Sequence, residues 1–189
     1  MKFLVIGDFH IPTRAKKIPS QFLSLINEEQ INVILCTGDF VEERVLNELE
    51  SIAQTVWVIG NMDFFASSPT KRKLRIGNYS IGLIHGHQIY PRGDKYKLFK
   101  IASQMDVNIL ISGHTHVPSI TIFKNVLLLN PGSATGCWSG SGGSLIPSLM
   151  ILKIENSDLL ISLYELKNNK LHKLSRSFKL LNNTINELN

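Results

Sequence analysis

Five short apolar runs organise the first two-thirds of this chain. Each is four or five residues long, contains β-branched side chains and is bounded by glycine or polar residues. They occupy residues 2–6, 33–36, 55–59, 80–84 and 107–111. Segments of this length and composition are typical of buried β-strands. The chain is therefore predicted to be built around a buried sheet.

Helical periodicity appears between some of these runs. Apolar residues recur at spacings of three and four around residues 22–26, 45–53 and 98–105, which predicts three amphipathic helices. Strands that alternate with helices favour crossover connections and an α/β fold whose first sheet is largely parallel.

After residue 117 the sequence no longer alternates between predicted strands and helices. Further strands with short turns are expected over residues 119–123, 126–129, 147–154, 158–166 and 171–178, with a hairpin turn at Asn168-Asn169. These strands predict a second, more antiparallel sheet that packs on the first. At 189 residues, the chain has a length that favours one domain. We assign it residues 1–180, followed by a polar tail over residues 181–189.

Polar side chains follow every one of the five early runs. In chain order they are Asp8 and His10, Asp39, Asn61 and Asp63, His85 and His87, and His114 and His116. Because parallel strands place their carboxyl ends at one edge of a sheet, where α/β folds bind ligands, these side chains are expected to converge.

Such a cluster would be costly on its own. Unpaired carboxylates and imidazoles in a poorly solvated cleft cost several kcal/mol, whereas one or two divalent cations would turn that cost into binding energy. Oxygen and imidazole ligands without a thiolate favour Mn²⁺, Fe²⁺, Zn²⁺ or Ni²⁺. The sequence therefore predicts a transition-metal site.

Two local patterns refine this prediction. The pairs Asp8-x-His10 and His114-x-His116 are expected to share one side of an extended segment. A glycine precedes Asp8, Asp39, Asn61 and His114, which indicates tight turns where the backbone approaches a ligand.

In this order, Gly7-Asp8-x-His10, Gly38-Asp39, Gly60-Asn61, His85 and Gly113-His114-x-His116 resemble the signature of the calcineurin-like metallophosphoesterases. Residues 82–88, 109–116 and 130–136 are further similar to the branch that includes the retromer subunit vacuolar protein sorting-associated protein 29 and its small prokaryotic phosphodiesterase relatives. The resemblance runs from residue 1 to about residue 180.

The resemblance implies a two-sheet αββα sandwich and a role for each ligand. It implies that a first metal ion is held by Asp8, His10 and His116, and a second by Asn61, His85 and His114. Asp39 matches the carboxylate that bridges both ions, of which Mn²⁺ is the expected metal.

The chain departs from the family pattern after Asn61. Many members carry a histidine there that assists the leaving group, whereas this chain has Met62. Asp63 and His87 are the local candidates for that acid. Eukaryotic retromer subunits tend to lose the bridging aspartate and the asparagine ligand, but this chain keeps both as Asp39 and Asn61, which favours a catalytic relative.

The expected activity is hydrolysis of a small phosphodiester by a hydroxide that bridges the two ions. With Met62 in place of histidine, diesters or activated esters are the preferred substrates. A scaffold that binds partner proteins with little or no catalysis is the alternative, and a nuclease or protein phosphatase of the same superfamily is a third, for which 189 residues leave little room.

Composition bounds the partners and the compartment. Two cysteines, Cys36 and Cys137, cannot form a disulfide framework, so a reducing, cytoplasmic location is expected. No apolar run is long enough to span a bilayer. The net charge of +5 is compatible with a phosphate ligand, while the basic run at residues 71–75 has no interleaved aromatics, so nucleic acid is not expected. A protein partner or a homo-oligomer remains open.

Overall fold

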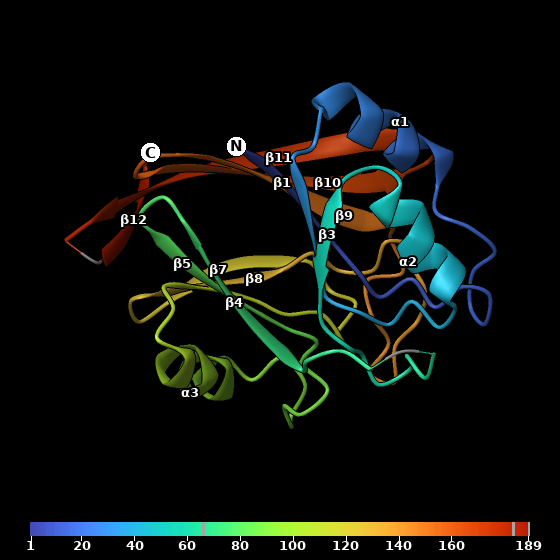
Figure 1. Cartoon of the computed structure of the whole chain (residues 1–189), viewed down its shortest axis with the longest axis horizontal. Coiled ribbons are helices and arrows are strands. Elements are labelled where there is room, and N and C mark those ends of the chain that lie inside the picture. Colours follow the sequence, from blue (N-terminus) through green and yellow to red (C-terminus); the bar gives the residue numbers. More distant parts are fainter. Residues whose placement is uncertain (66, 183, 189) are drawn as a thin grey trace.

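Two stacked β-sheets with helices on both outer faces make up the fold (Figure 1). The computed structural model describes residues 1–65, 67–182 and 184–188. One sheet has seven strands and the other has five. Large apolar side chains from both sheets fill the space between them, with Tyr79, Phe3 and Phe178 fully or almost fully buried.

The seven-stranded sheet combines early and late parts of the chain. Its strands are β1 (Lys2–Ile6), β2 (Val33–Cys36), β3 (Gln54–Trp57), β9 (Ser148–Glu155), β10 (Asp158–Lys167), β11 (Lys170–Leu181) and β12 (Thr184–Leu188), in the order β12-β11-β10-β9-β1-β2-β3. β1, β2 and β3 are parallel, and the other pairs are antiparallel. Asn168 and Asn169 both have positive φ at the β10–β11 hairpin, as its predicted turn requires.

The five-stranded sheet is formed by the middle of the chain. Its strands are β4 (Lys71–Ile76), β5 (Tyr79–Ile84), β6 (Ile109–Ile111), β7 (Ser119–Phe123) and β8 (Val126–Asn130), in the order β4-β5-β6-β8-β7. β5, β6 and β8 are parallel, while β4 and β7 pair antiparallel at the two edges. β4 carries the basic run, with its lysines and arginines exposed.

Helices α1 (Ser20–Glu29) and α2 (Glu43–Glu50) cover the outer face of the seven-stranded sheet, and α3 (Lys95–Met105) covers that of the five-stranded sheet. Their buried residues are the periodic apolar ones, such as Val45, Leu46 and Leu49 in α2. At α3, the Asp94 side chain caps the first turn by accepting a hydrogen bond from the Lys97 N–H. None of the helices in the described ranges is long and apolar enough to cross a bilayer.

The predicted two-sheet α/β sandwich is confirmed, and its detail differs from expectation in two places. Parallel strands are shared between the sheets, three in each, because a run buried on both faces carries no signal for which sheet it joins. The expected boundary at residue 180 falls inside β11, and β12 lies within the expected tail. Ile185 of β12 is buried against the inter-sheet core, which explains why this polar segment pairs with β11.

Candidate metal centre

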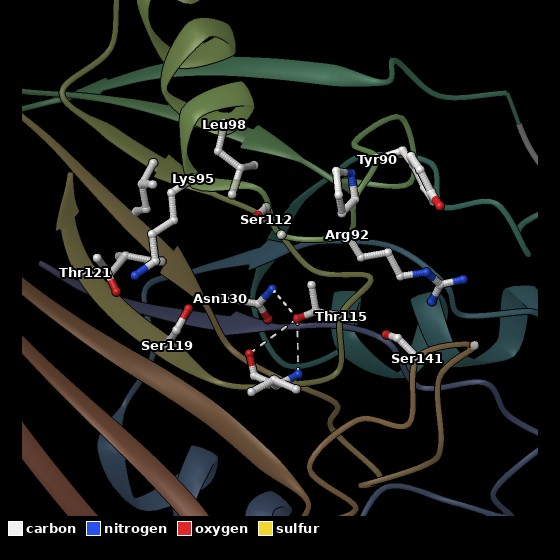
Figure 2. Close-up of a pocket in the computed structure, with 16 residues that line it drawn as sticks. Tyr90, Arg92, Lys95, Leu98, Ser112, Thr115, Ser119, Thr121, Asn130 and Ser141 are labelled. Atoms are coloured by element: carbon white, nitrogen blue, oxygen red, sulfur yellow. Dashed lines mark hydrogen bonds between the residues drawn. The ribbon is translucent and has the colours of Figure 1, made fainter. Parts of the chain in front are cut away.

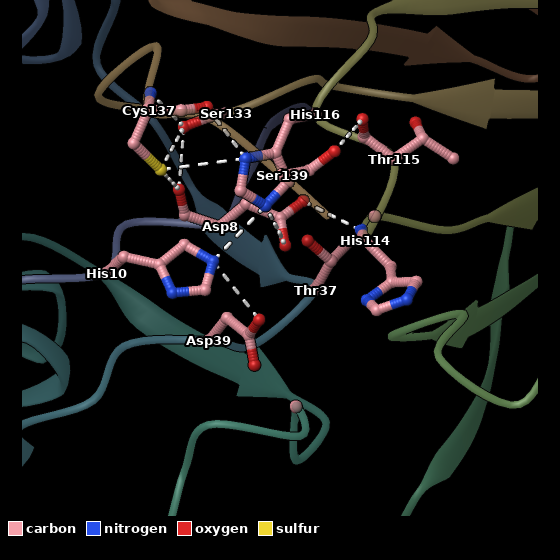
Figure 3. A network of polar contacts seen from close by, with 12 residues as sticks. Asp8, His10, Thr37, Asp39, His114, Thr115, His116, Ser133, Cys137 and Ser139 are labelled. Atoms are coloured by element: carbon pink, nitrogen blue, oxygen red, sulfur yellow. Dashed lines mark hydrogen bonds and ion pairs between the residues drawn. The ribbon is translucent and has the colours of Figure 1, made fainter. Parts of the chain in front are cut away.

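The seven predicted ligands lie together at one edge of the sandwich. Figure 3 shows five of them, which are Asp8, His10, Asp39, His114 and His116. They follow the carboxyl ends of parallel strands from both sheets: Asp8 and His10 after β1, Asp39 after β2, Asn61 after β3, His85 after β5, and His114 and His116 after β6. All are buried except Asn61, which is exposed. Side chains more than 100 residues apart in sequence thus share one small volume, as with His10 and His116.

One group of ligand atoms surrounds the imidazole of His10. Its Nε2 lies 3.2 Å from His116 Nε2 and 3.2 Å from Asp39 Oδ2. Asp8 Oδ1 is 3.6 Å from His116 Nε2. Four potential ligand atoms from three loops therefore face a common point.

A second group surrounds the imidazole of His85. Its Nε2 lies 3.1 Å from Asn61 Oδ1, 3.2 Å from His114 Nδ1 and 3.4 Å from Asp39 Oδ2. Asp39 Oδ2 is thus common to both groups, and it lies between them. A carboxylate oxygen with potential ligand atoms on both sides could serve two neighbouring ions.

Hydrogen bonds to the backbone orient these ligands. His85 Nδ1 donates to the Thr37 carbonyl and His116 Nδ1 donates to the Cys137 carbonyl, each at 2.8 Å. Since a carbonyl oxygen only accepts, both rings carry their proton on Nδ1 and turn the Nε2 lone pair inward. Asp8 and Asp39 each accept a backbone N–H with one oxygen and leave the other facing the cluster.

The cluster fits divalent metal ions. Asp8 Oδ1, which faces the cluster, is buried without a hydrogen-bond partner among the described residues. Burial, with the Asp39 charge next, holds the pKa of Asp8 well above its usual range, and burial raises the pKa of Asp39 to about 7. Burial also lowers the pKa of His10 to about 3 and that of His114 to about 4. Neutral imidazoles and uncompensated carboxylates are what a cation would complete.

The predicted extended geometry of the Asp-x-His and His-x-His pairs is wrong. Asp8, His10, His114 and His116 all adopt left-handed φ angles, between 49° and 69°. The loops coil tightly around the cluster instead of running past it. This agrees with the close approach predicted at the glycines: a Cβ on Gly113 would lie 2.7 Å from Asp8 Oδ2.

Asp63 has a different place from the one expected of a catalytic acid. Its carboxylate is buried and accepts four backbone N–H groups, those of Asp39, Phe40, Val41 and Gly60, at 2.7 to 3.0 Å. Both oxygens are therefore occupied in joining the loop after β2 to the loop after β3. Asp63 is a positioning residue for Asp39 and Asn61, and it does not serve as the acid that replaces the missing histidine.

Replacing Asp63 by Asn is expected to lower the free energy of unfolding by about 3–5 kcal/mol, because the amide –NH₂ would face backbone N–H donors left without an acceptor. Urea unfolding of the full chain measures this change. The control is Asp106→Asn, an exposed carboxylate that pairs with the Lys73 ammonium at the surface. Equal stability of the two variants would show that the four hydrogen bonds accepted by Asp63 do not stabilise the fold.

His87, the other candidate acid, lies outside the ligand cluster. It is exposed, with its ring centroid 5.4 Å from that of His85 and 6.3 Å from that of His114. Partial burial lowers its pKa. Met62 is held by its N–H, which donates to Asp39 Oδ1 at 2.9 Å, and its thioether offers no proton.

Two arginines that the sequence did not single out border the cluster. Arg14 Nη1 lies 3.4 Å from His10 Nε2, and its guanidinium stacks 3.9 Å from the centre of the exposed Trp138 ring. Arg92 Nη1 donates to the His114 carbonyl at 3.4 Å. Both line the same small pocket as the ligands. Isolated arginines in loops form no motif, so only the fold could place them here.

Comparison with known proteins places this centre in a family. The model of the calcineurin-like phosphoesterase superfamily domain matches residues 1–157. A probable metallophosphoesterase of Methanocaldococcus jannaschii is 41% identical over 131 residues, which cover 69% of this chain and 67% of that protein.

Solved structures agree. Wild-type Vps29 of Entamoeba histolytica complexed with zinc superposes with a TM-score of 0.88 at 39% identity, covering 94% of this chain and 99% of that one. Chaetomium thermophilum Vps29 complexed with a cyclic peptide gives 0.79 at 26% identity over 94% and 95% of the two chains. The chain belongs to the calcineurin-like phosphoesterase superfamily, in the branch that includes Vps29.

Proposed function

We propose that this protein is a dinuclear metal-dependent phosphodiesterase. The observation that carries the proposal is the pair of ligand groups that share Asp39 Oδ2. Asp8, His10, Asp39 and His116 would hold one ion, and Asp39, Asn61, His85 and His114 would hold the other. Mn²⁺ is the proposed metal, with Zn²⁺, Ni²⁺ and Fe²⁺ as alternatives that the same nitrogen and oxygen ligands accept.

The side chains around the proposed metal site would contribute to catalysis through their charge and by positioning the phosphate. When bound, two divalent ions supply Lewis acidity and an activated water as nucleophile. Asp8 and Asp39 bring too little negative charge to neutralise two divalent cations, so the site keeps an excess positive charge that suits a singly charged diester. Arg14 and Arg92 add two guanidinium groups at the rim, where they can grip non-bridging phosphate oxygens.

A screen of ions against substrates tests the proposal. The full chain, loaded in turn with Mn²⁺, Ni²⁺ and Zn²⁺, is assayed on bis(4-nitrophenyl) phosphate, 4-nitrophenyl phosphate and cyclic nucleotides. We expect metal-dependent release of nitrophenol from the diester above that from the monoester. Failure of every ion to support diester hydrolysis would refute the activity.

Removal of the rim guanidiniums is expected to weaken substrate binding. Arg92→Ala and Arg14→Ala should each raise KM for the diester by about tenfold, since each removes a charge-assisted contact to phosphate. Arg75→Ala, on the exposed face of β4, is the matched control. An unchanged KM in the Arg14→Ala/Arg92→Ala double variant would contradict the assignment.

His87 remains the proposed source of a proton for the leaving group. His87→Ala should slow hydrolysis of a cyclic nucleotide, whose leaving group is an alkoxide, by about 10²-fold while sparing nitrophenyl esters, which leave without protonation. His172→Ala, an exposed histidine of β11, is the control. Equal losses on both substrate types would remove the acid role.

Partner binding is the second candidate function, and the likeness to Vps29 favours it. The Vps29 of Chaetomium thermophilum accommodates a cyclic peptide, and Tyr90 and Val117 of this chain are exposed apolar side chains near the metal centre. A folded protein that hydrolyses no diester with any ion would favour this role over catalysis. For either function we propose a cytoplasmic location, in keeping with the free, buried thiols of Cys36 and Cys137.

A further inference from the structure

A cavity of about 600 Å³ opens beside the metal centre (Figure 2). Its walls come from the segment before α3, the first turn of α3, strands β7 and β8, and the loop around Gly140. This volume is within the range of pockets that bind small molecules. It is far larger than a phosphate group needs.

The cavity adjoins the small pocket of the metal centre. Arg92 and Gly140 line both the cavity and the small pocket that holds the ligands. Thr115, which lies between the ligands His114 and His116, forms part of the cavity wall. A phosphate ester whose phosphate sits at the metal-ligating residues and Arg92 would therefore have the cavity next to its organic group.

The cavity is lined by both apolar and hydrogen-bonding side chains, which determine the kind of organic group it can bind. Leu98, Val117, Leu128 and Leu129 supply apolar surface, and the hydroxyls of residues 119 and 121 supply hydrogen-bonding groups on the β7 side. The Asn130 amide is already engaged, because it donates to the Gly113 carbonyl and to Thr115 Oγ1. It shapes the wall and is not free to bind a ligand.

The charge of the cavity has one sign. Lys95 and Arg92 both line it, and no aspartate or glutamate does so among the residues that the structure describes. A cationic group placed here would meet two positive charges without a carboxylate to offset them. An uncharged group with hydroxyls would meet apolar walls and hydrogen-bonding partners.

We propose that this cavity is the subsite for one ester group of the substrate. The group is uncharged, ring-sized and hydroxyl-bearing, as in a nucleoside, and cationic headgroups are disfavoured. The inference rests on the proposed function and adds the substrate class to it. The phosphate would bind at the metal-ligating residues and the two arginines, Arg14 and Arg92. The cavity would bind the alcohol part of the ester and so determine which esters are accepted.

Calorimetric titration of the Mn²⁺-loaded full chain tests this with three monoesters that share the phosphate and differ in the alcohol: methyl phosphate, thymidine 5′-phosphate and phosphocholine. We expect the thymidine ester to bind about tenfold more tightly than methyl phosphate, and phosphocholine no more tightly than methyl phosphate. Equal dissociation constants for the thymidine and methyl esters, or phosphocholine as the tightest ligand, would overturn the proposal.

Two variants test whether the cavity causes the expected difference in affinity among the three monoesters. Thr121→Trp fills the cavity from β7 and should remove the thymidine advantage while leaving methyl phosphate unchanged; Thr184→Trp, on the exposed edge strand β12, is the matched control. Lys95→Glu should improve phosphocholine binding by about threefold, a modest change because Lys95 is exposed. Thymidine binding that Thr121→Trp does not weaken would also overturn the proposal.

Diester hydrolysis is measured in the same preparations. This measurement distinguishes a failure of the proposed phosphodiesterase activity from a failure of the proposed subsite. A wild-type protein that binds the monoesters in the expected order but hydrolyses no diester would contradict the proposed function alone. One that hydrolyses diesters but binds all three monoesters equally would contradict the subsite alone.

Discussion

Asp39→Asn is expected to reduce hydrolysis of bis(4-nitrophenyl) phosphate by about 10³-fold or more, equivalent to about 4 kcal/mol of transition-state stabilisation. The reason is geometric: Asp39 Oδ2 is 3.2 Å from His10 Nε2 and 3.4 Å from His85 Nε2, so it is the single atom common to both ligand groups. A neutral amide oxygen in its place would bind two cations weakly. Steady-state kinetics with saturating Mn²⁺ measures the loss.

Chelation should have the same result as the substitution, and Mn²⁺ added back should restore the wild-type rate but not that of the variant. Asp158→Asn, an exposed carboxylate on β10, serves as the control for the loss of a surface charge. Turnover that persists in the chelated wild-type protein would contradict a metal-dependent mechanism.

Saturation with Mn²⁺ is expected to raise the Tm of the wild-type protein by roughly 10 °C. An ion at about 1,000 times its Kd stabilises the folded state by about 4 kcal/mol, and a chain of this size gains about 2–4 °C per kcal/mol. The structure supplies the reason for a large effect, because Asp8 Oδ1, which faces the ligand cluster, is buried without a hydrogen-bond partner among the described residues. Differential scanning calorimetry with and without chelator measures the shift.

Asp8→Asn separates the metal from the fold in this experiment. The amide oxygen can still accept the His114 N–H, while the burial and the Asp39 charge that disfavour ionised Asp8 no longer act. We expect the chelated variant to be at least as stable as the chelated wild type, yet to gain less from Mn²⁺. An equal Mn²⁺ gain in both proteins would show that Asp8 contributes nothing to metal binding.

Much of the centre could be predicted because each ligand is encoded next to a strand end. Asp8, Asp39, His85 and His114 each follow a strand end by no more than three residues, and strands that run parallel bring their carboxyl ends to one edge. The order of the runs and the residue types at their ends therefore carry both the fold class and the ligand chemistry. No long-range information was needed to expect that these side chains meet.

The tertiary structure decided what depends on distant backbone. It divided the parallel strands between two sheets, and it coiled the ligand loops through left-handed residues. It also gave Asp63 four N–H partners from two separate loops, which excludes the acid role that its place after Asn61 had suggested.

Arg14, Arg92 and the cavity beyond them have no local pattern either, since they become neighbours of the ligands only after the sandwich closes. The sequence by itself determined which atoms could bind metal, because strand ends and ligand types are local properties. Only the tertiary structure determined how the ligand side chains are oriented, how burial shifts their pKa values, and which cavity lies beside them. The reason is that their hydrogen-bond partners and the cavity walls come from segments far apart in the chain.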